Sequence, residues 1–212
     1  MSCSQCIGIE ELFNDETVSK ELAAYRKNGP DKITRLLVDA LKEVGTQGKT
    51  LLDIGGGVGA IQHELLNNGV QTATHVDASS AYLSAARREA EQRGISDRIH
   101  FLHGNFVDLA ESLPPADIVT LNRVICCYND MVNLVGLSVE RSKALYGLVY
   151  PRNAWWVRLG MAILNLINKI QKNPFRGFAH PSRAVEDLIE KHDLRRIFYQ
   201  KTMIWQVAVY AR

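Results

Sequence analysis

The feature that most constrains the fold is a glycine-rich stretch near the end of the first quarter of the chain. Residues 50–65 read Thr-Leu-Leu-Asp-Ile-Gly-Gly-Gly-Val-Gly-Ala-Ile-Gln-His-Glu-Leu. A short apolar run enters the glycines and a helical pattern leaves them, which predicts a strand, a tight turn and a helix. Glycine is needed where the backbone takes positive φ or where a ligand presses against the main chain. Because the turn leads to the N–H groups that begin the helix, the stretch predicts half of a nucleotide site.

Two kinds of nucleotide fit this turn. The spacing of Gly55, Gly57 and Ala60 also matches the dinucleotide fingerprint, so an NAD-type ligand stays in contention. Asp53 is a carboxylate at the end of the strand, and it suits a ligand with a cationic head better than one with a pyrophosphate. Asp77 follows a second predicted strand, and it can accept hydrogen bonds from both hydroxyls of a ribose. Asp77 therefore indicates a ligand that contains adenosine, but it does not distinguish between the two kinds of nucleotide. Alternatively, Asp77 could have the structural role of capping the helix that starts near Ser79.

The segment from Leu51 to Gly59 closely resembles the first motif of the class I S-adenosylmethionine-dependent methyltransferases, which reads apolar-apolar-Asp-x-Gly-x-Gly-x-Gly. Later landmarks extend the resemblance over residues 50–212. In that superfamily the position of Asn105 is often Asp and binds the adenine amine, the next residue meets the adenine ring, and the position of Asn122 meets the methionine end. The resemblance implies S-adenosylmethionine as cofactor, S-adenosylhomocysteine as product, and binding by Asp53, Gly55, Gly57, Gly59, Asp77, Asn105, Phe106 and Asn122. Phe106 could equally be a core residue.

The expected fold class is α/β, a Rossmann-like class I methyltransferase sheet of seven strands whose last strand is antiparallel. Strands are predicted at 51–54, 72–76, 98–102, 118–121, 144–151, 195–201 and 204–210, with helices at 80–93 and 131–143. The last two strands read as a terminal hairpin. In the resembled superfamily, the closing hairpin distinguishes the methyltransferase fold from the dinucleotide fold.

The chain divides into a helical N-terminal cap, residues 1–48, and a cofactor-binding domain, residues 49–212. The helical pattern from Ile9 to Val44 predicts two or three helices before the first strand. In the resembled superfamily such an extension packs over the cofactor mouth, which would bring Tyr25 and Arg26 near it. The alternative is a solvated helix face on which Tyr25 serves only for packing.

An insert, residues 153–178, follows the fifth strand and is expected to be a lid. Its apolar residues form a broad helix face, with basic residues at the ends: Trp155, Trp156, Leu159, Met161, Ile163, Leu164, Leu166, Ile167 and Ile170, with Arg158, Lys169, Lys172 and Arg176. The segment is too short to span a bilayer. It could be a lid, an interfacial helix resting on a membrane or partner, or ordinary core. We favour the lid, because the insert lies on the ligand edge of the sheet, and a lid of this composition implies an apolar acceptor.

Candidate catalytic residues follow the fourth strand and precede the last predicted helix. The loop from Asn122 to Asp130 leaves the carboxyl end of a buried strand, where ligands of open α/β sheets bind. Its side chains Arg123, Tyr128 and Asn129 are the first candidates for contact with a methyl acceptor. His180, just before Pro181, could be a general base, since an ordinary histidine pKa lies near 6.5. Each of these residues could instead be structural.

The net charge and the cysteines exclude few classes of function, but they favour a small molecule as the partner. The formal charge of this 212-residue chain is +2, which does not call for nucleic acid. The N-terminus lacks a signal-peptide pattern, so a cytoplasmic protein is expected, and its cysteines, Cys3, Cys6, Cys126 and Cys127, are expected to be reduced. We expect no metal, and the role of Cys3 and Cys6 stays open.

The predicted function is methyl transfer to a small, apolar molecule, most simply at oxygen. The N-terminal helices, the glycine turn and the hydrophobic insert together resemble the architecture of the magnesium-protoporphyrin O-methyltransferases. The sequence lacks the Asn-Pro-Pro-Tyr signature of amino-group methylases of nucleic acids and some proteins. The alternatives are an NAD-type oxidoreductase and a protein that binds S-adenosylmethionine without catalysis; peripheral membrane contact through residues 155–170 is a further possibility.

Overall fold

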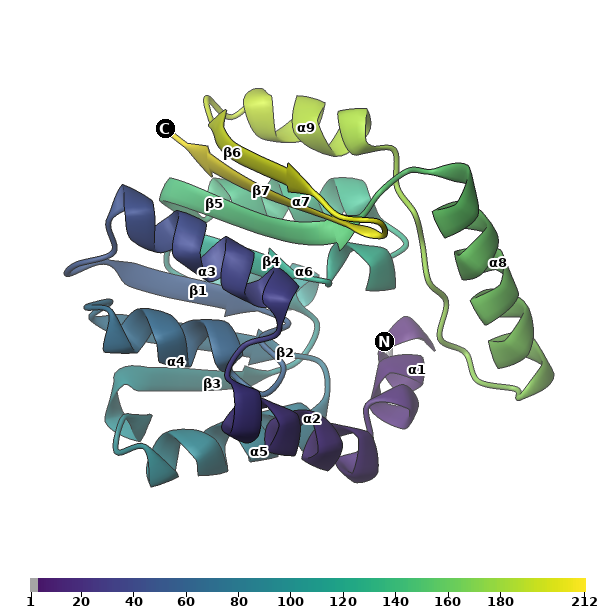
Figure 1. Ribbon diagram of the computed structural model, residues 1–212, viewed down its shortest axis with the longest axis horizontal. Helices are drawn as coiled ribbons and strands as arrows, with labels where there is room; N and C mark the ends of the chain where they lie inside the picture. The colour runs from purple at the N-terminus through teal and green to yellow at the C-terminus, as the bar shows by residue number, and fades with distance from the viewer. Residues whose placement is uncertain (1–3) are drawn as a thin grey trace.

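A seven-stranded sheet forms the centre of the computed structural model, which describes residues 4–212 and their side chains from Ile7 onward (Figure 1). The strands are β1 (Thr50–Ile54), β2 (Thr72–Asp77), β3 (Ile99–His103), β4 (Ala116–Asn122), β5 (Ser142–Pro151), β6 (Arg195–Lys201) and β7 (Trp205–Ala211). Their order is β3-β2-β1-β4-β5-β7-β6. The first five strands pair in parallel, and β7 lies between β5 and β6 antiparallel to both. This confirms the predicted fold class.

Helices cover both faces of the sheet (Figure 1). They are α1 (Ser4–Leu12), α2 (Asp15–Asn28), α3 (Lys32–Val44), α4 (Ala60–Asn67), α5 (Ser80–Gln92), α6 (Phe106–Leu109), α7 (Met131–Glu140), α8 (Trp155–Ile170) and α9 (Ser182–Glu190). Successive side chains of a strand point to opposite faces of the sheet, so the strands contribute to two hydrophobic cores. Leu51 packs with residues of α3, α4 and α5, whereas Leu52 packs with residues of α6, α7 and α9. The parallel strands are therefore buried on both faces, as their apolar runs require.

Some element boundaries differ from the sequence prediction. Helix α7 ends at Glu140, and β5 already begins at Ser142, because Ser142 pairs with Ala116 of β4. Within the insert predicted at 153–178, helix α8 ends at Ile170, because Lys172 takes a positive φ of 58° and the chain turns back. The local pattern predicted the elements, whereas pairing with β4 set the start of β5 and the left-handed residue Lys172 set the end of α8.

The three N-terminal helices have different surroundings. Leu37 and Leu41 of α3 are fully buried against the sheet, and an added Cβ at Gly147 of β5 would lie 2.8 Å from Leu37 Cδ1. Helix α2 instead packs over the glycine turn, where Val18, Leu22 and Tyr25 meet Val58, Tyr82 and Ala85. The division at residue 48 stays a prediction, and α3 is built into the sheet layers.

Little can be added about the first cysteine pair. Cys3 lies outside the described residues, and so does the side chain of Cys6. Within the described part of the chain, no helix has the length and apolar character needed to cross a membrane.

Candidate cofactor and acceptor site

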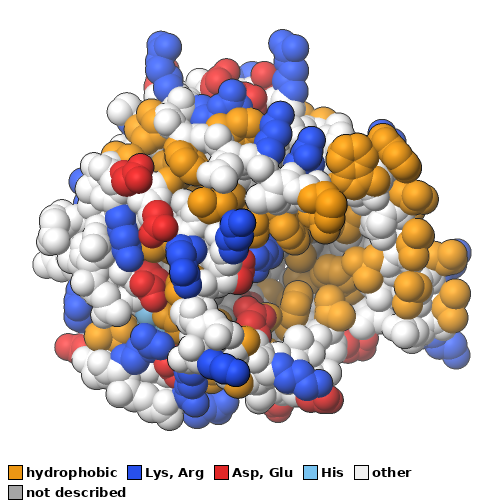
Figure 2. Space-filling model, viewed as in Figure 1, with side chains coloured by type: hydrophobic (Ala, Val, Ile, Leu, Met, Phe, Trp, Pro, Cys, Tyr) orange, Lys and Arg blue, Asp and Glu red, His pale blue; other side chains and the backbone are white. Residues whose placement is uncertain are grey.

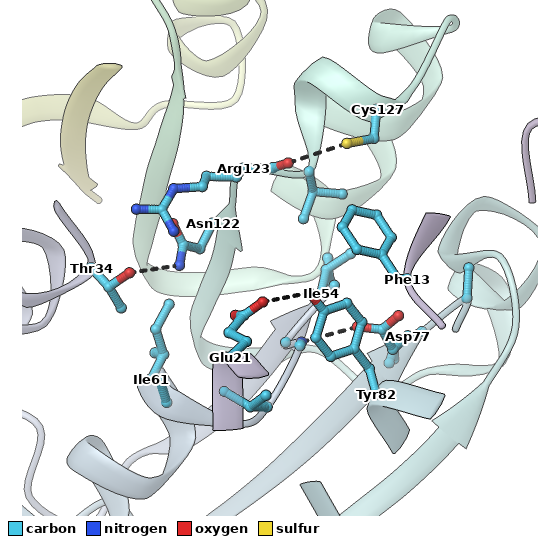
Figure 3. Close-up of a pocket in the computed structure, with 18 of the residues that line it drawn as sticks. Phe13, Glu21, Thr34, Ile54, Ile61, Asp77, Tyr82, Asn122, Arg123 and Cys127 are labelled. Atoms are coloured by element: carbon cyan, nitrogen blue, oxygen red, sulfur yellow. Dashed lines mark hydrogen bonds between the residues drawn. The ribbon is translucent and has the colours of Figure 1, made fainter. Parts of the chain in front are cut away.

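A cavity of about 420 Å³ lies at the carboxyl edge of β1, β2 and β4. Its walls come from the glycine turn, from α1 and α2, from the start of α6 and from the loop after β4 (Figure 3). This is the edge at which ligands of open parallel sheets bind, and the volume falls in the usual range for ligand pockets, roughly 300–1,000 Å³.

The glycine turn forms one wall of this cavity with bare backbone. Gly55 and Gly57 take φ values of +63° and +58°, which residues with a Cβ rarely adopt. At Gly55 an added Cβ would lie 2.4 Å from Val124 Cγ2. At Gly57 it would meet nothing closer than Tyr82 Cε1 at 3.7 Å, so the space beside Gly57 is open to a ligand.

Asp77 is fixed at the cavity wall by two backbone donors. The N–H of Gly57 donates to Asp77 Oδ2 at 3.0 Å, and the N–H of Ser79 donates to Oδ1 at 2.9 Å. Burial raises the pKa of Asp77 to about 6, against these two hydrogen bonds, which lower it. The carboxylate thus braces the turn and the residue before α5 while it lines the cavity. The cap of α5 is Ser79, whose hydroxyl accepts from the N–H of Tyr82, so the capping alternative for Asp77 is wrong and its binding role stays a prediction.

Asp53 does not line the cavity, contrary to the interpretation that it faces the cationic head of a ligand. It is fully buried, and Thr120 Oγ1 donates to its Oδ1 at 2.7 Å. A Cβ on Gly56 would lie 2.9 Å from Asp53 Oδ2, which shows that the carboxylate lies beneath the turn. Burial raises the pKa of Asp53 to about 7. Its strand position directs it into the sheet, whereas the next residues, Ile54 and Gly55, reach the cavity.

Asn105 and Phe106 line the cavity where the adenine is expected. Asn105 caps α6 by accepting from the N–H of Val107 at 3.4 Å, and its Nδ2 donates to the Tyr128 hydroxyl at 3.0 Å. Phe106 is also a buried member of the core, so both of its predicted roles are compatible with its position.

Asn122 and Arg123 enter the cavity from the end of β4, and a hydrogen-bond network joins them to the start of α3 (Figure 3). Asn122 Nδ2 donates to Thr34 Oγ1 at 3.1 Å, Thr34 Oγ1 donates to Asp31 Oδ2 at 2.7 Å, and Arg123 Nη2 binds Asp31 Oδ1 at 2.7 Å. Burial raises the pKa of Asp31, but its bonds from Arg123 and Thr34 outweigh burial and lower it to about 2. Among the described residues, Asn122 Oδ1 is buried without a hydrogen-bond partner.

Helix α2 supplies a residue that the sequence prediction missed. Glu21 lines the cavity, and its Oε2 accepts a hydrogen bond from the Tyr82 hydroxyl at 2.6 Å (Figure 3). Tyr25 lines the cavity as expected, and burial raises its pKa. Glu21 lies four residues before Tyr25, and this spacing on one helix face was the available signal. Arg26 lies outside the cavity, and binds Glu89 on α5 with an Nε to Oε2 distance of 2.7 Å.

His180 is not at the cavity, which removes the basis for its predicted role as general base. Its Nε2 lies 2.9 Å from the carbonyl oxygen of Tyr128, and its ring stacks on Phe178 with centroids 5.8 Å apart. A carbonyl can only accept, so Nε2 carries the proton and supports the loop from behind. Tyr128 itself lines the cavity, whereas Asn129 does not.

Helix α8 lies beside the opening without lining the cavity (Figures 1 and 2). The segment that returns from it meets α1 and the residue after it: an added Cβ at Gly8 would clash with the Phe175 backbone, and the rings of Phe13 and Phe175 are 6.4 Å apart. Eight large apolar side chains of α8 are exposed, so ordinary core is the wrong interpretation of this helix. Its role as a lid stays a prediction.

The residues present fit S-adenosylmethionine. The open backbone at Gly57 gives room for the ligand, and Asp77 presents acceptors for ribose hydroxyls. At the far end, the unpaired Asn122 Oδ1 offers an acceptor to an ammonium group.

Comparison with known proteins agrees with this geometry. Residues 51–136 match the methyltransferase-domain family. The tRNA 5-carboxymethoxyuridine methyltransferase of Escherichia coli K12 is 33% identical over 86 residues, a match that covers 40% of this chain and only 33% of that relative. Magnesium protoporphyrin IX methyltransferase from Synechocystis PCC 6803, crystallised with S-adenosylhomocysteine, superposes with a TM-score of 0.73 at 16% identity over 99% of this chain and all of that one. An O-methyltransferase family protein from Burkholderia thailandensis gives a TM-score of 0.70 at 16% identity over 95% of this chain and 61% of that one. These matches place residues 51–136 in the methyltransferase-domain family, and the whole chain shares the fold of the solved methyltransferases, with the same kind of mixed sheet.

Proposed function

We propose that this protein transfers a methyl group from S-adenosylmethionine to a small, apolar molecule at an oxygen atom. One observation carries the proposal: a single cavity joins the glycine turn and Asp77 to Asn122, Arg123 and Tyr128. A cofactor held at the first group would leave its far end facing the second. Ile9 and Phe13, from the N-terminal region, also line this space and make it apolar.

The cofactor supplies a methyl group already activated on a sulfonium, so the protein's work is mainly positioning. In favourable cases positioning lowers a barrier by about 7–11 kcal/mol. The turn at Gly55 and Gly57 and the carboxylate of Asp77 would hold the adenosine, while Asn105 and Phe106 would border the adenine. Asn122, held by Thr34, would orient the methionine end through its unpaired Oδ1.

Arg123 and Tyr128 would orient the acceptor from the loop after β4, since both line the cavity. A hydroxyl acceptor must also lose a proton. Asp31 is engaged by Arg123, so Glu21 is the proposed base in place of His180. Its carboxylate is oriented by the Tyr82 hydroxyl, which is the arrangement a positioned base requires.

A small acceptor is favoured over RNA or protein by the walls of the cavity. Residues of α1 and α2 lie over the same space as the glycine turn, and its lining is rich in Phe, Tyr, Ile and Val. A polynucleotide would require an accessible basic groove, and of the residues that line the cavity only Arg123 is basic. The tRNA relative matches only 40% of this chain and 33% of its own length, so the match does not carry its tRNA substrate over to this protein.

The proposal is tested first by ligand-dependent unfolding. S-adenosylmethionine and S-adenosylhomocysteine at about 100 times their dissociation constants should each stabilise the protein by about 2.7 kcal/mol, which is roughly 5–10 °C in Tm for a chain of this size. NAD(H) should give no shift. Asp77→Ala should weaken binding by about 10–100-fold, because hydrogen bonds to a charged group are lost. Asp39→Ala, an exposed position on α3, is the matched control and should bind normally.

Activity is then measured as transfer of labelled methyl to a panel of apolar hydroxyl compounds. Glu21→Gln should lower kcat about 100-fold or more and lower cofactor affinity far less, because the Gln oxygen can still accept the hydrogen bond from Tyr82. Stabilisation by NAD(H) alone would support the oxidoreductase alternative. Cofactor binding without transfer to any acceptor class would support the non-catalytic alternative.

A further inference from the structure

The apolar face of helix α8 points toward solvent. Five side chains at helical spacing are more than half exposed: Trp155 at 71%, Leu159 at 53%, Ile163 at 51%, Leu166 at 58% and Ile170 at 73%. Their spacing of three or four residues places them on one face. An amphipathic helix normally turns such a face toward the core, so this face lacks the cover that its composition calls for.

The opposite side of α8 carries the contacts to the rest of the chain. Asn165 and Gly177 exchange two hydrogen bonds, with Asn165 Nδ2 to Gly177 O at 2.9 Å and Gly177 N to Asn165 Oδ1 at 2.7 Å. Asn168 is buried and donates to the Phe175 carbonyl at 3.2 Å. Polar side chains thus hold the helix to its own return segment, and this attachment fixes the apolar stripe toward solvent.

The exposed apolar surface is concentrated rather than scattered. Among the residues the structure describes, eight of the fifteen exposed large hydrophobic side chains belong to α8. The tip of the β6–β7 hairpin adds Met203 and Ile204, 74% and 41% exposed, and the Trp156 indole lies near the Met203 carbonyl at 3.4 Å. Figure 2 shows this hydrophobic surface along the edge of the molecule where Figure 1 places α8. Isolated exposed apolar residues need no explanation, but a contiguous patch marks an interaction surface.

The charge around the patch identifies what covers it. Residues 152–176 contain five basic residues and no Asp or Glu, whereas the whole chain has a net charge of only +2. Arg158 and Lys169 are exposed and lie within a turn of the apolar stripe. Exposed Trp and Leu on one side with Lys and Arg beside them is the composition of helices that lie in the interface of anionic membranes.

A second copy of the chain fits this surface less well. A two-fold pairing through α8 would place the same stripe against itself. The flanking residues of both copies are basic, so such a pairing would oppose charges of one sign. We therefore propose that α8 and the hairpin tip dock on the surface of a bilayer that contains anionic lipid, with α8 lying in the plane of the interface. The helix is about 24 Å long at 1.5 Å per residue, which suits an interfacial position and not a crossing.

This inference concerns binding and is independent of the proposed reaction, so it is tested without activity. The full-length protein is sedimented with vesicles of phosphatidylcholine and phosphatidylglycerol in equal amounts, and with vesicles of phosphatidylcholine alone. It should bind the mixed vesicles and bind the neutral ones much less. Fluorescence of the tryptophans, two of three in α8, should shift to shorter wavelength on the mixed vesicles.

Two sets of variants test separately how the apolar stripe and the basic residues beside it contribute to vesicle binding. Leu166→Glu should lower vesicle partition by on the order of tenfold or more, since it places a carboxylate in the middle of the stripe. Val132→Glu on α7 is the matched control, because Val132 is 56% exposed against 58% for Leu166, and it should bind as the native protein does. Replacing Arg158 and Lys169 by Gln should weaken binding about fivefold per residue on mixed vesicles only.

Two results would overturn the proposal. One is failure of the native protein to bind the mixed vesicles while circular dichroism and thermal unfolding show that it is folded. The other is a dimer in analytical ultracentrifugation that Leu166→Glu converts to monomer and Val132→Glu does not, because a second copy would then cover the face.

Discussion

At the scale of single residues, Asp53 couples the stability of the fold to pH. Its pKa is about 7 in the folded protein, raised by burial from an ordinary value of 3.8. Between these two values the folded state holds a proton that the unfolded chain has released. Stability contributed by this group is therefore present at low pH and is lost as pH rises toward and through 7.

Asp53→Asn removes this dependence. Its amide oxygen can still accept from Thr120, and no group ionises at this position. Measured by urea unfolding, the variant should gain stability relative to the native protein between about pH 5 and about pH 8, by on the order of a few kcal/mol at most. Thr120→Val keeps the carboxylate and should keep the pH dependence. Equal pH slopes for Asp53→Asn and the native protein would contradict a buried, titrating Asp53.

At the scale of the element, the turn between β1 and α4 needs glycine for two reasons: its backbone takes positive φ, and a side chain there would fill the space left for the ligand. Gly57→Ala should cost about 1–2 kcal/mol of stability, because its φ of +58° is left-handed. Its new Cβ would also enter the space beside Tyr82, so cofactor affinity should fall tenfold or more.

Gly94→Ala separates these two effects. Gly94 has a φ of +69° and nothing within 4 Å of an added Cβ, and it does not line the cavity. It should show a comparable loss in Tm with normal affinity in calorimetric titration of S-adenosylhomocysteine. If both alanine variants bound equally well, the turn would not be the cradle of the cofactor.

At the scale of the whole molecule, the structure predicts where the chain can be shortened. A chain that begins at Pro30 keeps α3 and the Asp31 that caps it, and loses α1 and α2 with the small cluster over the glycine turn. It should unfold cooperatively with a lower Tm and bind cofactor weakly, because Tyr25 and Glu21 are gone. A chain that begins at Lys49 also loses Leu37 and Leu41, each of which contributes about 2–5 kcal/mol as a buried side chain. It should not fold, as near-ultraviolet circular dichroism would show. Cooperative folding of this shorter chain would instead support a division at residue 48.

The strands, the closing hairpin and the glycine turn were predictable because neighbouring residues encode them, whereas the arrangement of the sheet was implied by the resemblance. Leu51 and Leu52 alternate between two cores, and the glycines at 55 and 57 admit a conformation that other residues avoid. Asp77 was identifiable from its distance beyond the turn. These features depend on strand periodicity and backbone sterics, which act over a few residues.

Only the tertiary structure determined the direction in which individual side chains point. Asp53 lies beneath the turn because it meets Thr120, 67 residues away, and Arg123 is oriented by Asp31, 92 residues away. Glu21 reaches the cavity because α2 folds over the turn, and His180 supports the Tyr128 loop from outside. In the same way, α8 was evident as an apolar helix, but its return segment decided that the apolar face meets solvent. Local sequence determines that a helix or strand forms, whereas contacts between distant segments determine which way each of its faces points.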